Sequence, residues 1–216
     1  MRQIKLLMLF FICSLGSTQA QGLKNQISIQ GGYTRFTEVW NKAGFNFGFE
    51  NQLFLSKRFY LVGSVMCMNN NHVHSASFEE MLMTESVMVK IGDKTIRLRE
   101  NLWETNIGIG AGYDLLQTDK HRIYTHATVG VNLSRGYEDY ADLDFYVTTN
   151  GTIRSWKKAG SWDIKSNGFG AVLSLGYEYK LTDRLALGFS YNGTFTNGLD
   201  FYNSFNAKLG YSFTIH

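Results

Sequence analysis

The chain has 216 residues, with 21 basic and 18 acidic side chains and a formal net charge of +3. This near balance of charge argues against nucleic-acid binding, so we expect no nucleic acid among the partners. The chain has no proline, 22 glycines, 16 phenylalanines and 12 tyrosines, a composition typical of β-strands.

Residues 1–20 have the three parts of a secretory signal peptide: a short basic stretch, an apolar core at residues 6–15 and small residues before a cleavage site at Ala20. The core is too short for a membrane anchor, which needs about 20 residues. Cys13 could in principle be acylated, but it follows Phe11 and Ile12 rather than small residues, and we favour its removal with the peptide. Only Cys67 then remains in residues 21–216, which excludes an intrachain disulfide.

Alternation of apolar with small polar residues predicts eight strands in residues 21–216. We expect them at residues 25–36, 43–55, 58–68, 103–113, 123–134, 169–179, 185–195 and 208–215. In the second, Phe45 and Phe47 alternate with Asn46 and Gly48. Residues 58–68 are apolar on both faces, so their orientation stays open.

Short polar reversals lie near residues 57, 119 and 183, where Ser or Thr precedes charged residues. Loops at residues 37–42, 69–97, 136–165 and 196–202 lie on the opposite side. Short turns on one side and longer loops on the other are typical of an outer-membrane barrel.

The two long loops contain hairpin patterns. Residues 86–91 and 95–99 flank a turn at residues 92–94, and residues 144–149 and 152–156 flank the favoured pair Asn150-Gly151. We reject these as further membrane strands, because four cations crowd one segment that would face lipid (Lys90, Lys94, Arg97 and Arg99). We expect them to project beyond the membrane as a small sheet.

The end of the chain resembles the C-terminal signal by which bacterial outer-membrane proteins are recognised for assembly. Lys208, Gly210, Phe213 and Ile215 fill its positions, and His216 replaces the usual terminal aromatic residue. With the turns and the strand pattern, residues 21–216 resemble the small outer-membrane barrels of the OmpA/OmpX family. The resemblance implies an all-β fold: an eight-stranded antiparallel up-and-down transmembrane β-barrel with extracellular hairpin extensions, in the outer membrane of a Gram-negative bacterium. It also implies the barrel assembly machinery as a partner during biogenesis.

A secreted lipocalin-like barrel would show the same alternation with its apolar face inside. The polar faces here carry Gly, Ser, Asn and Thr with few charges, unlike a solvated surface. Aromatic residues also gather near the strand ends, as in interfacial girdles (Tyr33, Trp103, Tyr113, Tyr177, Tyr179, Tyr191 and Phe195). We therefore favour the membrane barrel.

Five ionisable residues lie on the predicted inner faces: Glu50, Glu104, Glu178, His126 and Lys208. An eight-stranded barrel is barely wide enough for its own side chains, so we expect these charges to pair. Lys208 with Glu50 is the preferred pair, because both lie about seven residues from the periplasmic end. A gate or ion path is the alternative to a filled, neutralised interior.

His126 and Thr128 have the spacing of the His and Ser in eight-stranded lipid A deacylases, but no orienting acid is evident. His72 and His74, near Glu79 and Glu80, lack a third metal ligand.

Asp139, Asp142 and Asp144 resemble the acidic residues of surface proteases, which use larger barrels. Cys67 fits a small apolar filler. We expect no catalytic centre, metal site or cofactor.

Residues 154–162 have the character of a binding segment, with two tryptophans among three cations (Arg154, Trp156, Lys157, Lys158 and Trp162). They suit anionic lipopolysaccharide or a surface protein partner, since Trp and Arg dominate interfaces. The alternative is that they extend the aromatic belt.

Together these patterns predict an integral outer-membrane protein that contacts lipid and lipopolysaccharide and has a non-enzymatic structural or surface-interaction role through its loops. A lipid A-modifying enzyme and a narrow pore are the alternatives.

Overall fold

The computed structural model describes residues 23–36, 43–83, 88–196 and 201–215; the predicted signal peptide lies outside them. These residues form eight strands: β1 (Leu23–Phe36), β2 (Ala43–Phe54), β3 (Phe59–Met83), β4 (Met88–Gln117), β5 (His121–Thr148), β6 (Gly151–Lys180), β7 (Leu185–Thr196) and β8 (Phe201–Ile215). No helix in the described part of the chain is long and apolar enough to cross a membrane.

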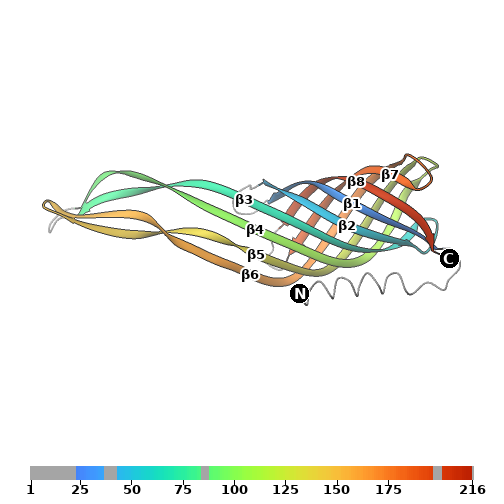
Figure 1. The fold of residues 1–216 in the computed structure, drawn as a ribbon, viewed down its shortest axis with the longest axis horizontal. Coiled ribbons are helices and arrows are strands. Elements are labelled where there is room, and N and C mark those ends of the chain that lie inside the picture. The colour runs from blue at the N-terminus through green and yellow to red at the C-terminus, as the bar shows by residue number, and fades with distance from the viewer. Residues whose placement is uncertain (1–22, 37–42, 84–87, 197–200, 216) are drawn as a thin grey trace.

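The strands pair antiparallel with their neighbours in the chain, and β8 returns to pair with β1 (Figure 1). The closing ladder runs from Leu23 opposite Ile215 to Phe36 opposite Tyr202. Closure gives each barrel segment a partner on both sides, which satisfies the backbone groups that a membrane would leave without water. The predicted eight-stranded up-and-down barrel is confirmed.

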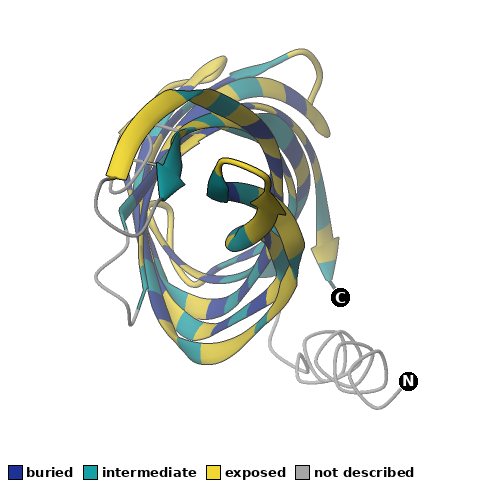
Figure 2. Cartoon of the chain, turned by 90° about the vertical axis from the view of Figure 1, so that its left-hand side faces the viewer, coloured by how far each residue is buried: buried dark blue, intermediate teal, exposed yellow. Residues whose placement is uncertain are grey.

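Buried and exposed residues alternate along the barrel strands (Figure 2); the large exposed residues are apolar, whereas most of the buried ones are polar. Ile29 and Phe189 are 57% and 62% exposed, whereas the neighbouring Ser28 and Ser190 are buried. Residues 58–68, whose orientation the sequence left open, place Tyr60 inside and Leu61 outside. This arrangement is the inverse of a water-soluble barrel, and the outer wall suits contact with lipid.

The three short turns share one hydrogen-bonding pattern. The side-chain oxygens of Ser56, Thr118 and Thr182 each accept a hydrogen bond from the backbone N–H three residues later, at 3.0, 2.9 and 3.0 Å. A Ser or Thr hydroxyl thereby satisfies a turn backbone group. The turns lie where the sequence predicts them and mark the periplasmic end of the barrel.

Strands β3 to β6 are much longer than the others and project beyond one rim of the barrel (Figure 1). A transmembrane strand needs about 9–11 residues, and these four have 25 to 30. Pairing between β4 and β5 ends at Glu100 opposite Glu138. Beyond it, β3 with β4 and β5 with β6 continue as two ribbons, which we call the extension and which confirm the predicted projecting strands.

The ribbons join again at the tip. There β3 pairs with β6, with Met81 opposite Arg154 and Met83 opposite Thr152. Together with the β3–β4 and β5–β6 ladders, this pairing creates a tip sheet in the order β4–β3–β6–β5. The two long hairpins therefore form one body rather than two separate loops.

The prediction of a turn at residues 92–94 is wrong. Gly92 and Asp93 lie within β4, opposite Glu80 and Glu79 of β3, and the chain reverses between Met83 and Met88 instead. The Gly-Asp-Lys sequence resembles a turn locally. It remains extended because residues 69–83, expected as loop, form the outer part of β3 and supply the ladder partner.

The turn expected at Asn150-Gly151 is present but lies one residue earlier. Thr148 is the ladder partner of Gly151, so Thr149 and Asn150 are the central residues. Gly151 has a φ of 135°, in the region that favours glycine. Glycine is thus required just after the turn.

Candidate functional site

A buried cation inside the barrel is shared by two carboxylates. The Nζ of Lys208 on β8 lies 3.1 Å from Glu50 Oε2 on β2 and 3.3 Å from Glu178 Oε1 on β6. All three side chains are inaccessible to solvent or nearly so. The structure thus places Lys208 beside Glu50, and it adds Glu178 as a second carboxylate.

Arg122 on β5 extends this network towards the periplasmic end. Its Nη1 lies 2.9 Å from Glu178 Oε2, and its Nε donates to Asp114 Oδ1 at 2.7 Å. The guanidinium lies over the rings of Phe54 and Tyr60, 4.9 and 5.0 Å from their centres. Such stacking and planar hydrogen bonding suit Arg better than Lys.

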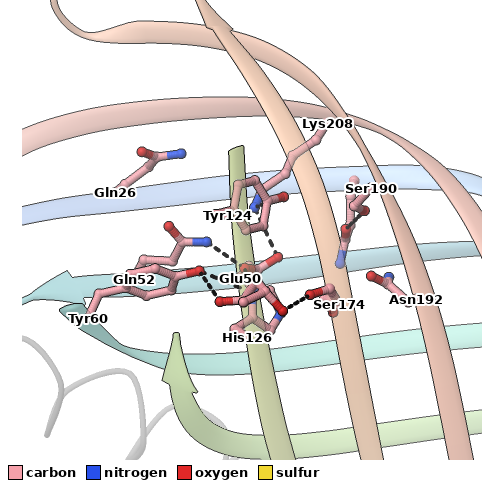
Figure 3. A network of polar contacts seen from close by, with 12 residues as sticks. Gln26, Glu50, Gln52, Tyr60, Tyr124, His126, Ser174, Ser190, Asn192 and Lys208 are labelled. Carbon is pink, nitrogen blue, oxygen red and sulfur yellow. Dashed lines mark hydrogen bonds and ion pairs between the residues drawn. The ribbon is translucent and has the colours of Figure 1, made fainter. Parts of the chain in front are cut away.

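Aromatic and imidazole rings complete the network (Figure 3). Tyr124 Oη accepts a hydrogen bond from Lys208 at 3.0 Å, and the Tyr124 ring stacks on His126 at 5.8 Å. His126 Nδ1 lies 3.6 Å from Glu50 Oε1 and 3.5 Å from Tyr60 Oη. The imidazole therefore belongs to the same cluster as the ion pairs.

Two glycines make room for the inner tyrosines. A Cβ at Gly112 would lie 2.2 Å from the Tyr60 ring, and one at Gly176 would lie 2.2 Å from the Tyr124 ring. Each tyrosine lies directly opposite its glycine on the neighbouring strand. The rings thus fill the lumen only because these positions have no side chain.

Glu104, the fifth predicted inner charge, lies in a different setting. Its Oε1 accepts hydrogen bonds from Tyr202 at 2.8 Å and from Ser134 at 3.3 Å. Along β4 it lies four residues from Glu100, where the barrel part of the strand ends. The structure therefore brings four of the five predicted residues together and places the fifth apart.

The sequence analysis missed Arg122 and Asp114. A usable signal existed, because Arg122 stands two residues before Tyr124, and Asp114 two residues after Gly112, on faces already assigned to the interior. Extending each alternation by one step into the adjoining turn region would have found both. Both were missed because the predicted strands, residues 103–113 and 123–134, end one residue short of them.

The arrangement offers no obvious nucleophile for the deacylase alternative. His126 Nδ1 contacts Glu50 and Tyr60, whereas Thr128 Oγ1 has no hydrogen-bond partner among the described residues. Both side chains are buried in the lumen, out of reach of a lipid ester. A Ser- or Thr-based mechanism requires its hydroxyl to reach the base.

The histidines considered as metal ligands do not form a metal site in the described residues. His72 and His74 stack with ring centres 6.1 Å apart, on the half-buried face of β3. Within the described residues, no group of three or more His, Cys, Asp or Glu side chains has the geometry to hold a metal ion.

Asp139 anchors the base of the extension. It is buried, and its carboxylate accepts hydrogen bonds from Lys158 Nζ at 2.5 Å, Ser161 Oγ at 2.6 Å and the Arg99 backbone N–H at 2.9 Å. Burial opposes ionisation, but the hydrogen bonds from Lys158, Ser161 and Arg99 outweigh it and hold the pKa of Asp139 below its ordinary value. Asp139 thereby joins β4, β5 and β6.

Asp142 and Asp144 do not share a site with Asp139. Asp142 accepts a hydrogen bond from the Leu143 backbone at 2.8 Å, and Asp144 forms an ion pair with Lys157 at 3.2 Å. Three acids with separate partners do not form a catalytic cluster.

The two tryptophans of residues 154–162 have different surroundings. Trp156 stacks on Phe78 of β3, with ring centres 4.7 Å apart and planes inclined by 23°, and so joins the two ribbons. Trp162 is 65% exposed and meets Tyr140 edge-on at 5.3 Å. The structure does not bring them into a single surface.

The cations of this segment are largely neutralised. Lys158 pairs with Asp139 at 2.5 Å and Lys157 with Asp144 at 3.2 Å. Arg154 lies at the tip, opposite Met81 and Phe145. The segment is therefore a set of ribbon contacts rather than one basic patch.

The tip instead carries a group of exposed apolar side chains, which the sequence analysis missed. They belong to the outer strands β4 and β5 of the tip sheet and are 48% to 87% exposed (Met88, Val89, Ile91, Phe145, Tyr146 and Val147). We call these six residues the apolar tip. Both apolar runs are visible in the sequence, but only the β3–β6 pairing brings them to the same tip.

The predicted assembly signal lies in the closing strand. Phe213 and Ile215 are half-buried and lie opposite Asn25 and Leu23 of β1. Gly210 lies close to Gln26, whose Nε2 would be 2.7 Å from a Cβ at that position. Recognition of these residues by the assembly machinery stays a prediction.

Comparisons with known proteins agree with this architecture. A family model described as the outer membrane protein beta-barrel domain matches residues 6–213. The structure resembles Ail, the attachment invasion locus protein of Yersinia pestis, with a TM-score of 0.51, 12% identity, and 88% of this chain and 99% of that chain covered. It also resembles Neisserial surface protein A, with a TM-score of 0.52, 13% identity, and coverage of 88% and 97%. At these identities the likeness concerns the fold, and a search of curated proteins found no match.

Proposed function

Because the chain belongs to the outer-membrane protein β-barrel family and lies in the bacterial outer membrane, we propose that it is a non-enzymatic surface-contact protein. Its filled barrel anchors the extension, and the apolar tip is the contact site. The observation that carries this proposal is the exposure of the tip residues: Val147 is 87% exposed and Phe145 55%.

The apolar tip is too far from the barrel rim to be part of the lipid-facing wall. The last β4–β5 ladder pair is at Glu138, and at about 3.3 Å per residue the strand to Val147 spans about 30 Å. These side chains lie on the two outer strands of the tip sheet, at the far end of a solvated element, and exposed apolar groups of this kind are typical of interaction sites. The position favours contact with another surface over contact with the protein's own membrane.

Cross-ribbon contacts hold the tip away from the membrane. Asp139 joins β4 to β5 and β6 at the base, and the Trp156–Phe78 stack joins β6 to β3 further out. Lys94 Nζ on β4 donates to Ser155 Oγ on β6 at 3.1 Å, and Ser155 also donates to Glu80. A braced element loses little conformational entropy when it binds, which favours affinity.

The barrel interior supports an anchoring role. The cluster around Lys208 and Arg122 takes side chains from opposite walls, and its rings and ion pairs fill the lumen at that level. A narrow pore would need an open path for water or ions at this level, and the side chains of the cluster occupy that space. Thr128 Oγ1 has no hydrogen-bond partner among the described residues, which likewise argues against a deacylase.

The charge pairing on the extension favours an apolar partner surface over a polyanion. Ail is described in complex with the heparin analogue sucrose octasulfate, a polyanion. In this chain Lys157 and Lys158 already pair with carboxylates, which makes these two cations less available to such a ligand. We therefore assign the contact to the apolar tip.

Adhesion of bacteria that produce the protein tests the proposal. The tip variant combines Met88→Ser, Val89→Ser, Phe145→Ser and Val147→Ser, and the matched control is Val73→Ser, an exposed apolar residue elsewhere on β3. Wild type and control should adhere to an alkyl-coated surface, and the tip variant should lose most of that adhesion. Equal adhesion by a tip variant present in equal amount at the cell surface would refute the proposal.

Two measurements address the alternatives. A changed mass of lipid A in cells that overproduce the protein would support the alternative of a lipid A-modifying enzyme. Steady conductance in a planar bilayer would support the alternative of a narrow pore. We expect neither.

A further inference from the structure

A groove of about 380 Å³ lies on the outer wall of the barrel, lined by Tyr33 and Arg35 of β1, Tyr191 of β7, and Asn203 and Phe205 of β8. All five positions lie near the ends of their strands at which the extension projects. The groove is on the lipid-facing side of the barrel and is separate from both the buried ion network and the apolar tip.

The ladder register arranges the groove in two levels. Tyr33, Phe205 and Tyr191 lie side by side on β1, β8 and β7, and the rings of Phe205 and Tyr191 pack at an angle of 56° with their centres 4.9 Å apart. Arg35 lies opposite Asn203, two residues closer to the extracellular rim on each strand. Aromatic side chains prefer the membrane interface, so the polar level above them lies at the depth of lipid headgroups.

The polar level offers hydrogen-bond donors to the groove. Tyr191 Oη donates to Asn203 Oδ1, so the amide oxygen of Asn203 is engaged and its amide N–H groups are the part that can donate to the groove. A guanidinium has five N–H donors, so Arg35 can bind an oxyanion while it keeps another contact. None of the residues that line the groove is a carboxylate.

We propose that this groove binds the phosphate group of an outer-leaflet lipid. Arg35 and Asn203 donate hydrogen bonds to the phosphate oxygens, and an acyl chain of the same lipid lies on Tyr33, Phe205 and Tyr191. A charged donor level directly above an aromatic level matches a lipid whose phosphate and chain are joined, and a free anion would use only the upper level. The proposal is independent of what the apolar tip contacts.

Lipid retention by the refolded full barrel tests the site. The protein is held in an alkyl maltoside, which has no phosphate, and is given phosphatidic acid or diacylglycerol, which share acyl chains and differ in the phosphate. Native mass spectrometry then counts bound lipid. Wild type should retain phosphatidic acid in preference to diacylglycerol, and Arg35→Gln should lower that retention about tenfold, as expected for a lost charge-assisted hydrogen bond.

The matched control is Arg97→Gln, which removes the same charge from an exposed position on the extension. It should retain phosphatidic acid like wild type, and heat-dependent gel migration should show that all variants are folded. Inorganic phosphate at millimolar concentration should leave the lipid bound. The proposal is overturned if Arg35→Gln retains phosphatidic acid like wild type, if diacylglycerol is retained equally, or if inorganic phosphate displaces the lipid.

Discussion

The ammonium group of Lys208 lies 3.1 Å from the carboxylate of Glu50, and neither side chain is accessible to solvent. The two residues come from opposite ends of the chain, and closure of β8 on β1 brings them into the same part of the lumen. Since Glu178 also contacts Lys208, at 3.3 Å, one cation holds two buried carboxylates. Its removal should cost more than the loss of a single surface ion pair.

Replacing Lys208 with Met should destabilise the refolded barrel by about 3–5 kcal/mol, because it leaves Glu50 and Glu178 buried without their shared cation. The urea midpoint of unfolding, followed by gel migration in detergent, measures the change. The double variant Lys208→Met with Glu50→Gln should recover part of the loss, since it removes one of the two orphaned charges. An unchanged midpoint in the single variant would show that the pair contributes little.

Filling the space beneath an inner tyrosine should also destabilise the barrel. Gly112→Val forces the Tyr60 ring to move, because even a Cβ there lies 2.2 Å from it, and overpacking of this kind costs about 1–3 kcal/mol. Gly92→Val on the extension is the matched control, since a Cβ there meets no atom within 4 Å. The urea midpoint should fall for Gly112→Val and remain unchanged for Gly92→Val.

The base of the extension should depend on pH through Asp139. Its pKa is lowered in the folded protein, so its stabilising contribution is fully present above the unfolded-state pKa of about 3.9 and is lost as the pH falls towards the folded-state value. The protection factors of the amides in β4 and β5 near Arg99 and Asp139, which correct for the pH dependence of intrinsic exchange, should therefore stay high from neutral pH to about pH 4 and fall below it. Asp139→Asn should remove this pH dependence and exchange faster at neutral pH. A titration curve shared by wild type and Asp139→Asn would exclude this role.

Trp156 and Trp162 should differ when each is replaced with Ala. Loss of the Trp156–Phe78 stack should weaken the contact between the ribbons by about 0.5–1.5 kcal/mol. Limited proteolysis of the extension should then be faster for Trp156→Ala. Trp162→Ala, which removes an exposed side chain, serves as the control and should be cleaved like wild type. Equal cleavage of both variants would argue that the stack does not brace the ribbons.

The sequence by itself determined the barrel. Alternation, the Ser and Thr turns near residues 57, 119 and 183, and the apolar stripe of the last strand depend on neighbours within a few residues, so they can be read along the chain. They predicted the strand order, the outward face and the end of the barrel at which the long segments project. Lys208, Glu50, Glu178 and His126 could be placed in the interior on the same grounds.

The sequence also suggested the pair Lys208 with Glu50, but only the tertiary structure decided the other contacts of the interior. Contacts across the lumen depend on ladder register and on barrel closure, which bring Arg122 and Asp114 into the network and leave Glu104 with Tyr202 and Ser134. The same holds for the extension, where β3 residues 69–83 keep Gly92 and Asp93 extended and a β3–β6 ladder creates the tip sheet. A local pattern specifies how a strand faces, whereas the partner of a strand is set by residues far away in the sequence.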